Sequence, residues 1–351
     1  MLSQQSIIFP ISCKFEHPTT SRHTYPLIDT DRSGIIFRKG DMLMRDIKNV
    51  YIIGLGAIGG AYGSRIMENC PETLKVLAGG SRFENYINNG VIVNGKKIPF
   101  TYVKSGTAEE KADLIMIAVK NHHLAQTIEE ISSLVGPDTI ILSLLNGITS
   151  EETVGSVFGM DKMLFSFCVA TDAVREGTNI SYANIGRIVF GDRSNSAESE
   201  KVIAVRAYFD RVKLPYVVPE SIMRELWWKF MLNVGINQVS AILRAPYGSF
   251  AKKGYAQDLM TDASREVIKI AQKAGIALTD EDIKKYIDII TTLSPEGKTS
   301  MFQDVEAGRK TEVEIFSGTV CELGRKYGVP TPVNDMLFRF IRAIEESASA
   351  V

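Results

Sequence analysis

Short unbroken runs of apolar residues alternate with longer amphipathic stretches through the first two thirds of the chain. The first run, 50–53 (VYII), ends in glycines, which is typical of a buried parallel strand. A helical pattern follows at about 57–68, and a second apolar run lies at 74–78. This alternation predicts a doubly wound α/β domain. Further strand-like runs lie at 113–119, 139–145, 163–169, 185–190 and 216–218, and a helical stretch lies at 124–134.

The last third of the chain carries helical patterns alone, separated by glycines and prolines. We therefore predict an α/β domain of the Rossmann type over 45–218 and an all-α domain over 219–351. The predicted helices of the second domain are 221–243, 255–274, 280–293, 299–327 and 334–346.

Residues 1–44 sustain neither a helical nor a strand period, and Pro10, Pro18 and Pro26 interrupt them. They resemble neither a secretory signal nor, because they contain several acidic residues, a mitochondrial presequence. Our hypothesis is that the folded protein begins near Met44 and that this leader is disordered or is not a native start. The alternative is a short ordered extension packed on the first domain.

The charge balance excludes some classes of partner. Lys and Arg number 40 against 41 Asp and Glu in 351 residues, which predicts no basic surface for nucleic acid. Mean hydropathy is +0.02 and no apolar run reaches membrane length, so no membrane partner is predicted. The four cysteines are widely spaced, which argues against a zinc site or a disulfide framework and suits the cytoplasm. We predict no metal.

A glycine motif follows the first strand. GLGAIGG (54–60) supplies the pattern Gly-x-Gly-x-x-Gly between a predicted strand and a predicted helix, where it binds the pyrophosphate of a dinucleotide at the helix N-terminus. The alternative is a glycine-rich turn without a ligand. The expected cofactor contacts in this motif are Gly54, Leu55, Gly56, Ala57, Ile58 and Gly59.

The end of the second strand indicates which cofactor binds. An NAD binder usually places an acidic residue there for the ribose 2′-hydroxyl, but this stretch reads AGGSR (78–82). Ser81 and Arg82 suit a 2′-phosphate, which predicts NADP(H). In the alternative, Arg82 is a solvated surface residue and Glu84 binds the ribose.

Few proton donors remain for a carbonyl reduction. No tyrosine has a lysine four residues later, no zinc-ligand spacing occurs, and no histidine follows His123. His122 and His123 are interpreted as a loop pair with a structural role. Lysine is therefore the leading proton donor.

Two polar stripes interrupt the apolar helices of the second half. Lys229, Asn233 and Asn237 recur every four residues and share one helix face, which is costly unless it meets a cavity or partners. The alternative is a solvated face whose asparagines join neighbouring helices. A second stripe, in the predicted helix 299–327, consists of Ser300, Asp304, Gly308 and Glu312.

The sequence resembles the ketopantoate reductase (2-dehydropantoate 2-reductase) family over about residues 49–340. Lys120 and Asn146-Gly147 followed by Glu151-Glu152 match it, and three longer blocks match it more specifically. The resemblance implies a Rossmann-type domain followed by a helical domain like that of 6-phosphogluconate dehydrogenase, with the site in the cleft between them. The specific blocks are RELWWKFMLNVGIN (224–237), SMFQDVEAGRKTEVEIFSG (300–318) and GVPTPVNDML (328–337).

The resemblance also implies roles for single residues. Lys229 would be the general acid that protonates the C2 oxygen, and Glu312 would support it as a second catalytic residue. Ser300 would bind the substrate carboxylate, and Asp304 would orient its neighbours. Asn146, Asn233 and Asn237 would bind substrate, with Asn146 also near the nicotinamide, and Lys120 would lie along the cofactor.

The favoured hypothesis is therefore an NADPH-dependent reduction of 2-dehydropantoate to pantoate, a step toward pantothenate and coenzyme A. One alternative is a sibling reductase of another branched 2-oxo acid. Another is a nicotinamide-sensing protein without turnover, which would need neither Lys229 nor Glu312. The expected partner is a small 2-oxo acid, and the expected assembly is a monomer or a homodimer.

Overall fold

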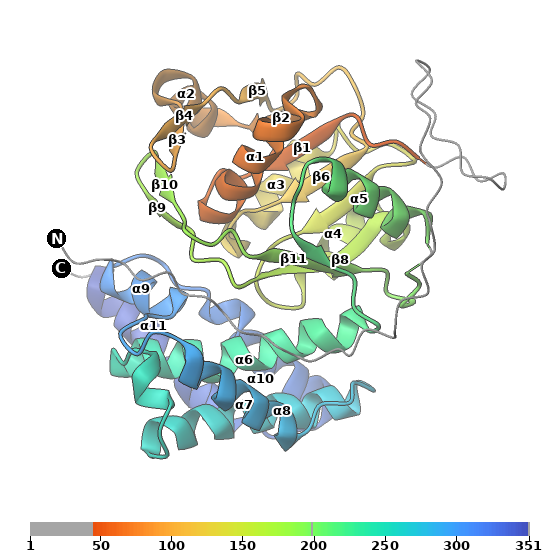
Figure 1. Cartoon of the computed structure of the whole chain (residues 1–351). Helices are drawn as coiled ribbons and strands as arrows, with labels where there is room; N and C mark the ends of the chain where they lie inside the picture. Colours follow the sequence, from red (N-terminus) through yellow and green to blue (C-terminus); the bar gives the residue numbers. More distant parts are fainter. Residues whose placement is uncertain (1–44, 198, 350–351) are drawn as a thin grey trace, which may run out of the picture.

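The computed structural model describes residues 45–197 and 199–349, and the predicted leader lies outside these residues. Figure 1 shows a sheet-containing body followed along the chain by a helical body, with helix α6 (Ile222–Leu243) running along the boundary between them. The predicted fold class is confirmed: a largely parallel sheet with helices comes first and an all-helical part follows. The predicted division at residue 218 falls between the last strand and α6.

The main sheet has eight strands in the order β12-β11-β8-β7-β6-β1-β2-β5. All neighbours are parallel except β8 and β11. β2 lies on one side of β1 and β6 on the other, so the strand order reverses at β1. In sheets of this type, ligands bind beyond the carboxyl ends of the strands at such a reversal. The strands are β1 Val50–Ile53, β2 Leu74–Ala78, β5 Thr101–Lys104, β6 Leu114–Ile117, β7 Ile140–Ser143, β8 Met163–Val169, β11 Arg187–Gly191 and β12 Tyr216–Val217.

The central strands are buried along their whole length because helices cover them. Every residue of β1, β6 and β7 is buried, which explains their unbroken apolar sequences. The helices of this half are α1 Ala57–Asn69, α2 Gly80–Asn89, α3 Leu124–Ile131, α4 Ser150–Phe158 and α5 Glu200–Arg211.

A second sheet of four strands, in the order β4-β3-β10-β9, packs beside α1. A Cβ atom on Gly60 of α1 would lie 2.1 Å from Cδ1 of Ile180 in β10, so the glycine allows this close approach. The sequence analysis did not predict this sheet, whose strands have three residues each. They are β3 Val91–Val93, β4 Lys96–Ile98, β9 Val174–Glu176 and β10 Asn179–Ser181.

Helix α6 is the centre of the helical half. It packs against α7, α9 and α11 and also against β8 and β11 of the sheet, so its apolar residues face partners on several sides. The apolar core of this half accordingly includes Phe165 and Phe167 of β8. The other helices are α7 Tyr255–Lys273, α8 Asp280–Thr292, α9 Ser300–Glu306, α10 Ser317–Tyr327 and α11 Pro332–Ser349. The 3₁₀ turns are η1 Pro71–Thr73, η2 Asn121–His123, η3 Met160–Lys162, η4 Tyr247–Phe250 and η5 Val313–Ile315.

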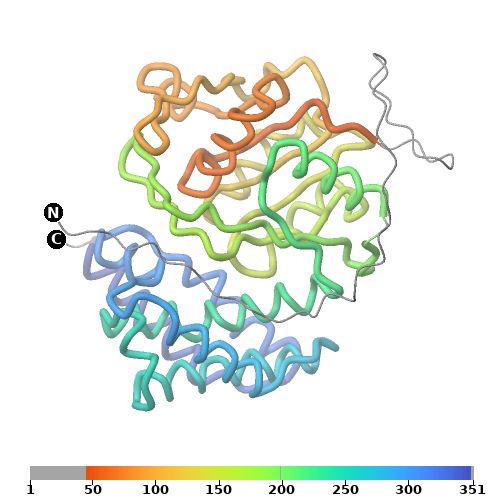
Figure 2. The backbone as a smooth tube through the Cα atoms, viewed as in Figure 1, coloured from red at the N-terminus to blue at the C-terminus, as the bar shows by residue number. Residues whose placement is uncertain are grey.

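The single helix predicted over 299–327 is wrong. Helix α9 ends at Glu306, and the chain then turns through Gly308 with φ +62° and through η5 before α10 begins. The left-handed glycine and the bond from Arg309 N–H to the Asp304 carbonyl, 2.8 Å, form a helix C-terminal stop. Figure 2 shows the backbone turning here, so Glu312 does not share a helix with Ser300 and Asp304.

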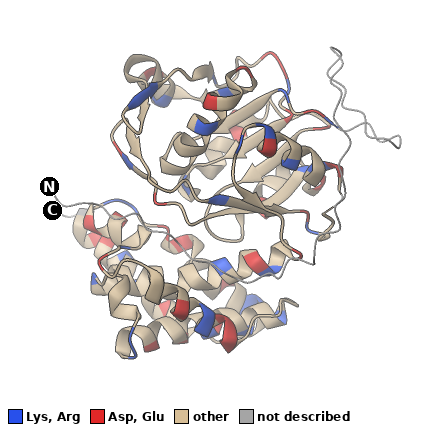
Figure 3. Cartoon of the chain, viewed as in Figure 1, with Lys and Arg blue, Asp and Glu red and all other residues tan. Residues whose placement is uncertain are grey.

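Figure 3 shows that the positions of Lys and Arg and those of Asp and Glu are interspersed along the ribbon of both halves, in keeping with the near-zero net charge. Among the residues described, no helix combines the length and the apolar character that crossing a membrane requires.

Candidate functional site

The glycine loop between β1 and α1 has the geometry of a phosphate cradle. Gly54 has φ +94°, and a Cβ atom on Gly59 would lie 1.9 Å from the Gly54 carbonyl oxygen, so both positions require glycine. A Cβ atom on Gly56 would meet only the Ala118 carbonyl oxygen, 3.9 Å away, and would otherwise project into open space. No side chain caps the N-terminus of α1, which leaves its first N–H groups available to a diphosphate.

At the end of β2, the Arg82 side chain is not free to bind a phosphate as the sequence predicts. Ser81 and Arg82 lie in the first turn of α2, and Ser81 is exposed. The Arg82 side chain is not a freely solvated group, because its Nη2 donates to Oε1 of Glu130 on α3 at 2.9 Å. The guanidinium predicted to bind a 2′-phosphate therefore already has an anionic partner.

Four predicted residues meet across the two halves of the molecule. Lys120 follows β6, and its Nζ lies 2.8 Å from Oδ2 of Asp304 on α9 and 3.7 Å from Oε2 of Glu312. The same Glu312 oxygen accepts a hydrogen bond from Nδ2 of Asn146, after β7, at 3.0 Å. Asp304 and Glu312 are both buried, so the break after α9 still returns Glu312 to the neighbourhood of Asp304.

Lys229 lies on α6 and points its ammonium at the sheet. Its Nζ donates to the backbone carbonyl of Cys168 near the end of β8 and lies 5.8 Å from the centre of the Phe167 ring. Burial lowers the pKa of Lys229, while the nearby Cys168 and, to a smaller extent, Glu312 act to raise it. A lysine with a lowered pKa gives up a proton more readily than an ordinary surface lysine.

The remaining predicted residues lie on α6 and α9, apart from this cluster. Asn233 is half-buried one turn beyond Lys229 on α6, and Asn237 is buried two turns beyond it. Ser300 is exposed in the first turn of α9, one turn before Asp304. Within the described residues, no side-chain hydrogen bond joins these three to Lys229 or Glu312.

The structure also shows partners that the sequence analysis missed. Nε of Arg309 donates to Oδ1 of Asp304 at 2.9 Å, so this aspartate binds a cation on each oxygen. Arg175 of β9 donates to the Leu55 carbonyl within the glycine loop. The role of the Cys168 carbonyl could not be predicted from the sequence, because every residue has a backbone carbonyl. The spacing of Asp304 and Arg309 around Gly308, by contrast, could have indicated their contact.

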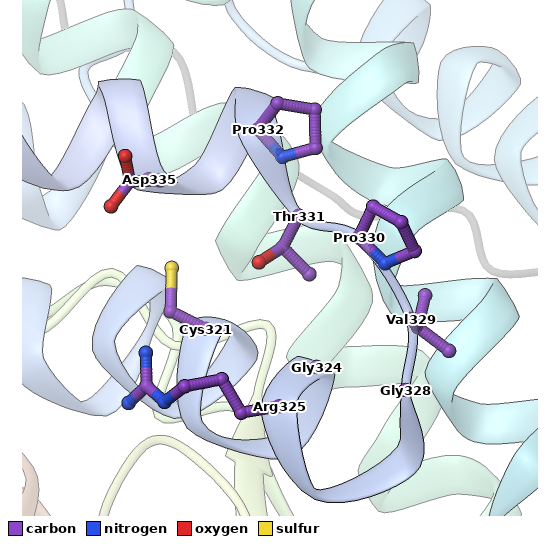
Figure 4. Close-up of a pocket in the computed structure, with 9 residues that line it drawn as sticks. All are labelled: Cys321, Gly324, Arg325, Gly328, Val329, Pro330, Thr331, Pro332 and Asp335. Atoms are coloured by element: carbon purple, nitrogen blue, oxygen red, sulfur yellow. The ribbon is translucent and has the colours of Figure 1, made fainter.

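One pocket lies apart from this cluster, in the helical half. A pocket of about 500 Å³ lies between α10 and α11, with the Cys321, Thr331 and Asp335 side chains around it (Figure 4), and it includes none of the predicted site residues. His122 and His123 are exposed in η2 beside Lys120, with ring centres 4.2 Å apart. Over residues 45–197 and 199–349, no group of three or more His, Cys, Asp or Glu could hold a metal ion.

Two family models match the chain in succession. Residues 50–195 match the model described as ketopantoate reductase PanE/ApbA, and residues 221–345 match the model of its C-terminal part. The chain belongs to the ketopantoate reductase family. Members of this family are nicotinamide-dependent oxidoreductases that act on CH–OH groups. The two matched segments contain every residue of the Lys120, Asn146, Asp304 and Glu312 cluster.

Similar sequences come from bacteria and archaea. A protein of Aquifex aeolicus named 2-dehydropantoate 2-reductase is 27% identical over 304 residues, which cover 84% of this chain and 96% of the relative. One of the same name from Pyrococcus horikoshii is 27% identical over 300 residues, covering 84% and 97%. These alignments extend the family assignment over nearly the whole length of both relatives.

Solved structures share the fold. A PanE/ApbA family ketopantoate reductase from Ralstonia eutropha superposes with a TM-score of 0.74 at 23% identity and covers 86% of this chain and 99% of its own. A D-mandelate dehydrogenase in a ternary complex with NADH and anilino(oxo)acetate gives a TM-score of 0.75 at 24% identity, with the same coverage. The ketopantoate reductase fold thus accompanies more than one named substrate.

Proposed function

We propose that this chain reduces 2-dehydropantoate to (R)-pantoate with NADPH, a step in the synthesis of pantothenate and coenzyme A. The family and the names of its relatives support the reaction class. The observation that carries the proposal is the placement of Lys229, a half-buried ammonium at the boundary between the α/β and helical halves. A lysine in this position, with a lowered pKa, has the properties of a general acid.

The proton is delivered by Lys229 in the mechanism we propose. When bound, the reduced nicotinamide supplies the hydride that forms the new C2–H bond. Lys229 gives a proton from Nζ to the C2 oxygen, is left neutral, and regains a proton from solvent. While it is charged, its ammonium also stabilises negative charge that develops on that oxygen. The carbonyl of Cys168 holds the ammonium in place before the substrate arrives.

The other predicted residues have supporting roles. We propose that Glu312 helps to keep Lys229 charged, because its negative charge acts to raise the pKa of this lysine. Asn146 is held by Glu312 at 3.0 Å and is assigned to the substrate and nicotinamide. Ser300 is assigned to the substrate carboxylate, Asn233 and Asn237 to the rest of the substrate, and Lys120 to the cofactor.

The cofactor assignment is also part of the proposal. The glycine loop (Gly54, Leu55, Gly56, Ala57, Ile58 and Gly59) fits a diphosphate because the position of Gly56 is open and the start of α1 is uncapped. Ser81 and Arg82 are assigned to a 2′-phosphate. We also propose a cytoplasmic location, on the basis of the wide spacing of the cysteines. The proposed assembly is a monomer or a homodimer, and analytical ultracentrifugation would distinguish the two.

A substrate panel tests the reaction. NADPH oxidation is followed with 2-dehydropantoate, with other branched 2-oxo acids and with 2-oxo-2-phenylacetate, the acid that corresponds to mandelate. The last is included because a D-mandelate dehydrogenase shares the fold. We expect the highest kcat/KM with 2-dehydropantoate. A higher kcat/KM with another acid would show that the chain is a sibling reductase of that acid. Binding of NADPH without turnover of any acid would favour the alternative of a nicotinamide-sensing protein.

A further inference from the structure

A carboxylate stands at the tip of β2 although the sequence places no acidic residue there. It belongs to Glu130 on α3, of which only 8% is exposed. Its Oε1 accepts two hydrogen bonds, from Nη2 of Arg82 at 2.9 Å and from Nε2 of Gln126 at 2.7 Å. Its Oε2 is buried and has no hydrogen-bond partner among the described residues. A buried carboxylate oxygen without a donor is energetically costly, which makes a purely structural role a poor account of Glu130.

Gly79 makes room for this carboxylate. Gly79 directly follows β2, and a Cβ atom built on it would lie 2.7 Å from Oε1 of Glu130. The carboxylate therefore occupies the space that a side chain at position 79 would fill. In dinucleotide-binding folds, an acidic side chain at the end of this strand accepts the ribose hydroxyl of NAD. Glu130 supplies such a carboxylate from a different helix.

The charge of Glu130 acts against a 2′-phosphate in two ways. It neutralises Arg82, the cation assigned to that phosphate, and it repels the phosphate directly through a poorly solvated region. A ribose 2′-hydroxyl experiences neither penalty. A carboxylate has about four acceptor positions, and both hydrogen bonds here go to Oε1, so the acceptor positions that remain are those of the buried Oε2.

We propose that Glu130 is the residue that sets cofactor selectivity, by weakening the binding of the 2′-phosphorylated cofactor so that the chain uses NADH as well as NADPH. This inference rests on the proposed nicotinamide-dependent function, whose cofactor choice it refines. It makes Arg82 a shared group, which pairs with Glu130 in the absence of a phosphate and with the phosphate when NADPH binds.

The test measures equilibrium binding of NADPH and of NADH, from the fluorescence of the reduced nicotinamide, without any 2-oxo acid. In the wild type we expect dissociation constants for the two cofactors within about tenfold of each other. Glu130→Gln removes the charge and keeps the shape, so NADPH should bind about tenfold more tightly and NADH no more tightly than before. The matched control is Glu129→Gln, the same change on the exposed neighbouring residue, for which we expect less than a twofold change.

A second variant tests the same proposal without changing Glu130, in case Glu130→Gln does not fold. Gly79→Ala adds a Cβ atom at a backbone conformation that alanine tolerates, φ −112°, and should displace the carboxylate and shift selectivity toward NADPH. An unchanged NADPH-to-NADH ratio in both folded variants would overturn the proposal, as would a wild type that binds NADPH more than 100-fold more tightly than NADH. Failure of the proposed reaction would appear in turnover and not in these binding constants, so the two failures are distinguishable.

Discussion

Lys120 and Asp304 are 184 residues apart in the chain, yet Nζ of Lys120 lies 2.8 Å from Oδ2 of Asp304. Lys120 follows a strand of the sheet, and Asp304 belongs to a helix of the second half, so the pair joins the two halves at the proposed site. Arg309 holds the other oxygen of the same carboxylate, which fixes its orientation. We infer that this pair sets how closely the halves approach each other around the substrate.

A double-mutant cycle measures the strength of this link. Lys120→Met and Asp304→Asn, alone and combined, should show a coupling free energy of about 1 kcal/mol in urea unfolding, because Asp304 is buried while Lys120 is partly exposed. The exposed pair Arg339 and Asp335 on α11 is the control, with an expected coupling below about 0.5 kcal/mol. Additive effects of the two site mutations would show that the contact contributes no coupling free energy between the halves.

A substitution in the glycine loop should weaken cofactor binding without destabilising the fold. Gly56→Ala should leave the unfolding free energy within about 1 kcal/mol of the wild type, because φ is −69° and the nearest atom to the new Cβ is 3.9 Å away. It should weaken cofactor binding at least about tenfold, because the methyl group enters the space assigned to the diphosphate. Calorimetry and cofactor titration measure the two quantities. Gly59→Ala, by contrast, should destabilise the fold itself, and undiminished binding by Gly56→Ala would refute the assignment.

The electrostatic influence of Glu312 on Lys229 predicts a shift in the pH profile of the reaction. A general acid must be protonated, so kcat/KM should fall as the pH rises through the pKa of Lys229. Glu312 acts to raise this pKa, and Glu312→Gln removes that influence. The alkaline limb of the profile should therefore move to lower pH. Glu314→Gln, two residues along the chain, is the charge-matched control, and a limb that moves equally in both variants would contradict the role of Glu312.

Glu151 predicts a pH-dependent stability that is independent of catalysis. Burial raises the pKa of Glu151 from 4.5 to about 7, although Ser150 and Ser166 donate hydrogen bonds to it. Its folded-state pKa exceeds the unfolded value, so the folded state binds this proton more tightly. Stability should therefore decline by about 3 kcal/mol as the pH rises from 4.5 to 7 and stay level above that.

Chemical denaturation across this pH range checks the prediction. Glu151→Gln should remove most of the decline, whereas Glu152→Gln, an exposed neighbour, should keep it. Equal slopes in the wild type and in Glu151→Gln would indicate that another group is responsible.

The fold was predictable where one apolar face determines the element. β2 and β8 were predicted with the observed bounds because apolar runs and flanking breakers mark both ends, and α6 differs by one residue. The three-residue strands of the second sheet were missed because such short segments carry too little periodicity. The break after α9 was missed because four-residue spacing continued through Gly308, and only the left-handed backbone there ends the helix.

The site was predictable to the extent that its chemistry lies in side chains on regular elements. The α6 stripe pointed to Lys229 before any family resemblance was used. The convergence of Lys120, Asn146, Asp304 and Glu312 depends on how the two halves pack, which no local pattern encodes. The Arg82 and Glu130 pair was equally invisible, because 48 residues separate its members and the space at Gly79 exists only in the folded chain.

The central claim is that Lys229 donates the proton in the reduction of a 2-oxo acid. The most direct test is the rate of NADPH oxidation with saturating 2-dehydropantoate for the wild type, for Lys229→Ala and for Lys269→Ala, an exposed lysine on α7. We predict that Lys229→Ala loses about two to four orders of magnitude in kcat while its NADPH dissociation constant stays within about twofold, and that Lys269→Ala behaves as the wild type. A Lys229→Ala enzyme that keeps more than about a tenth of the wild-type kcat would contradict the account.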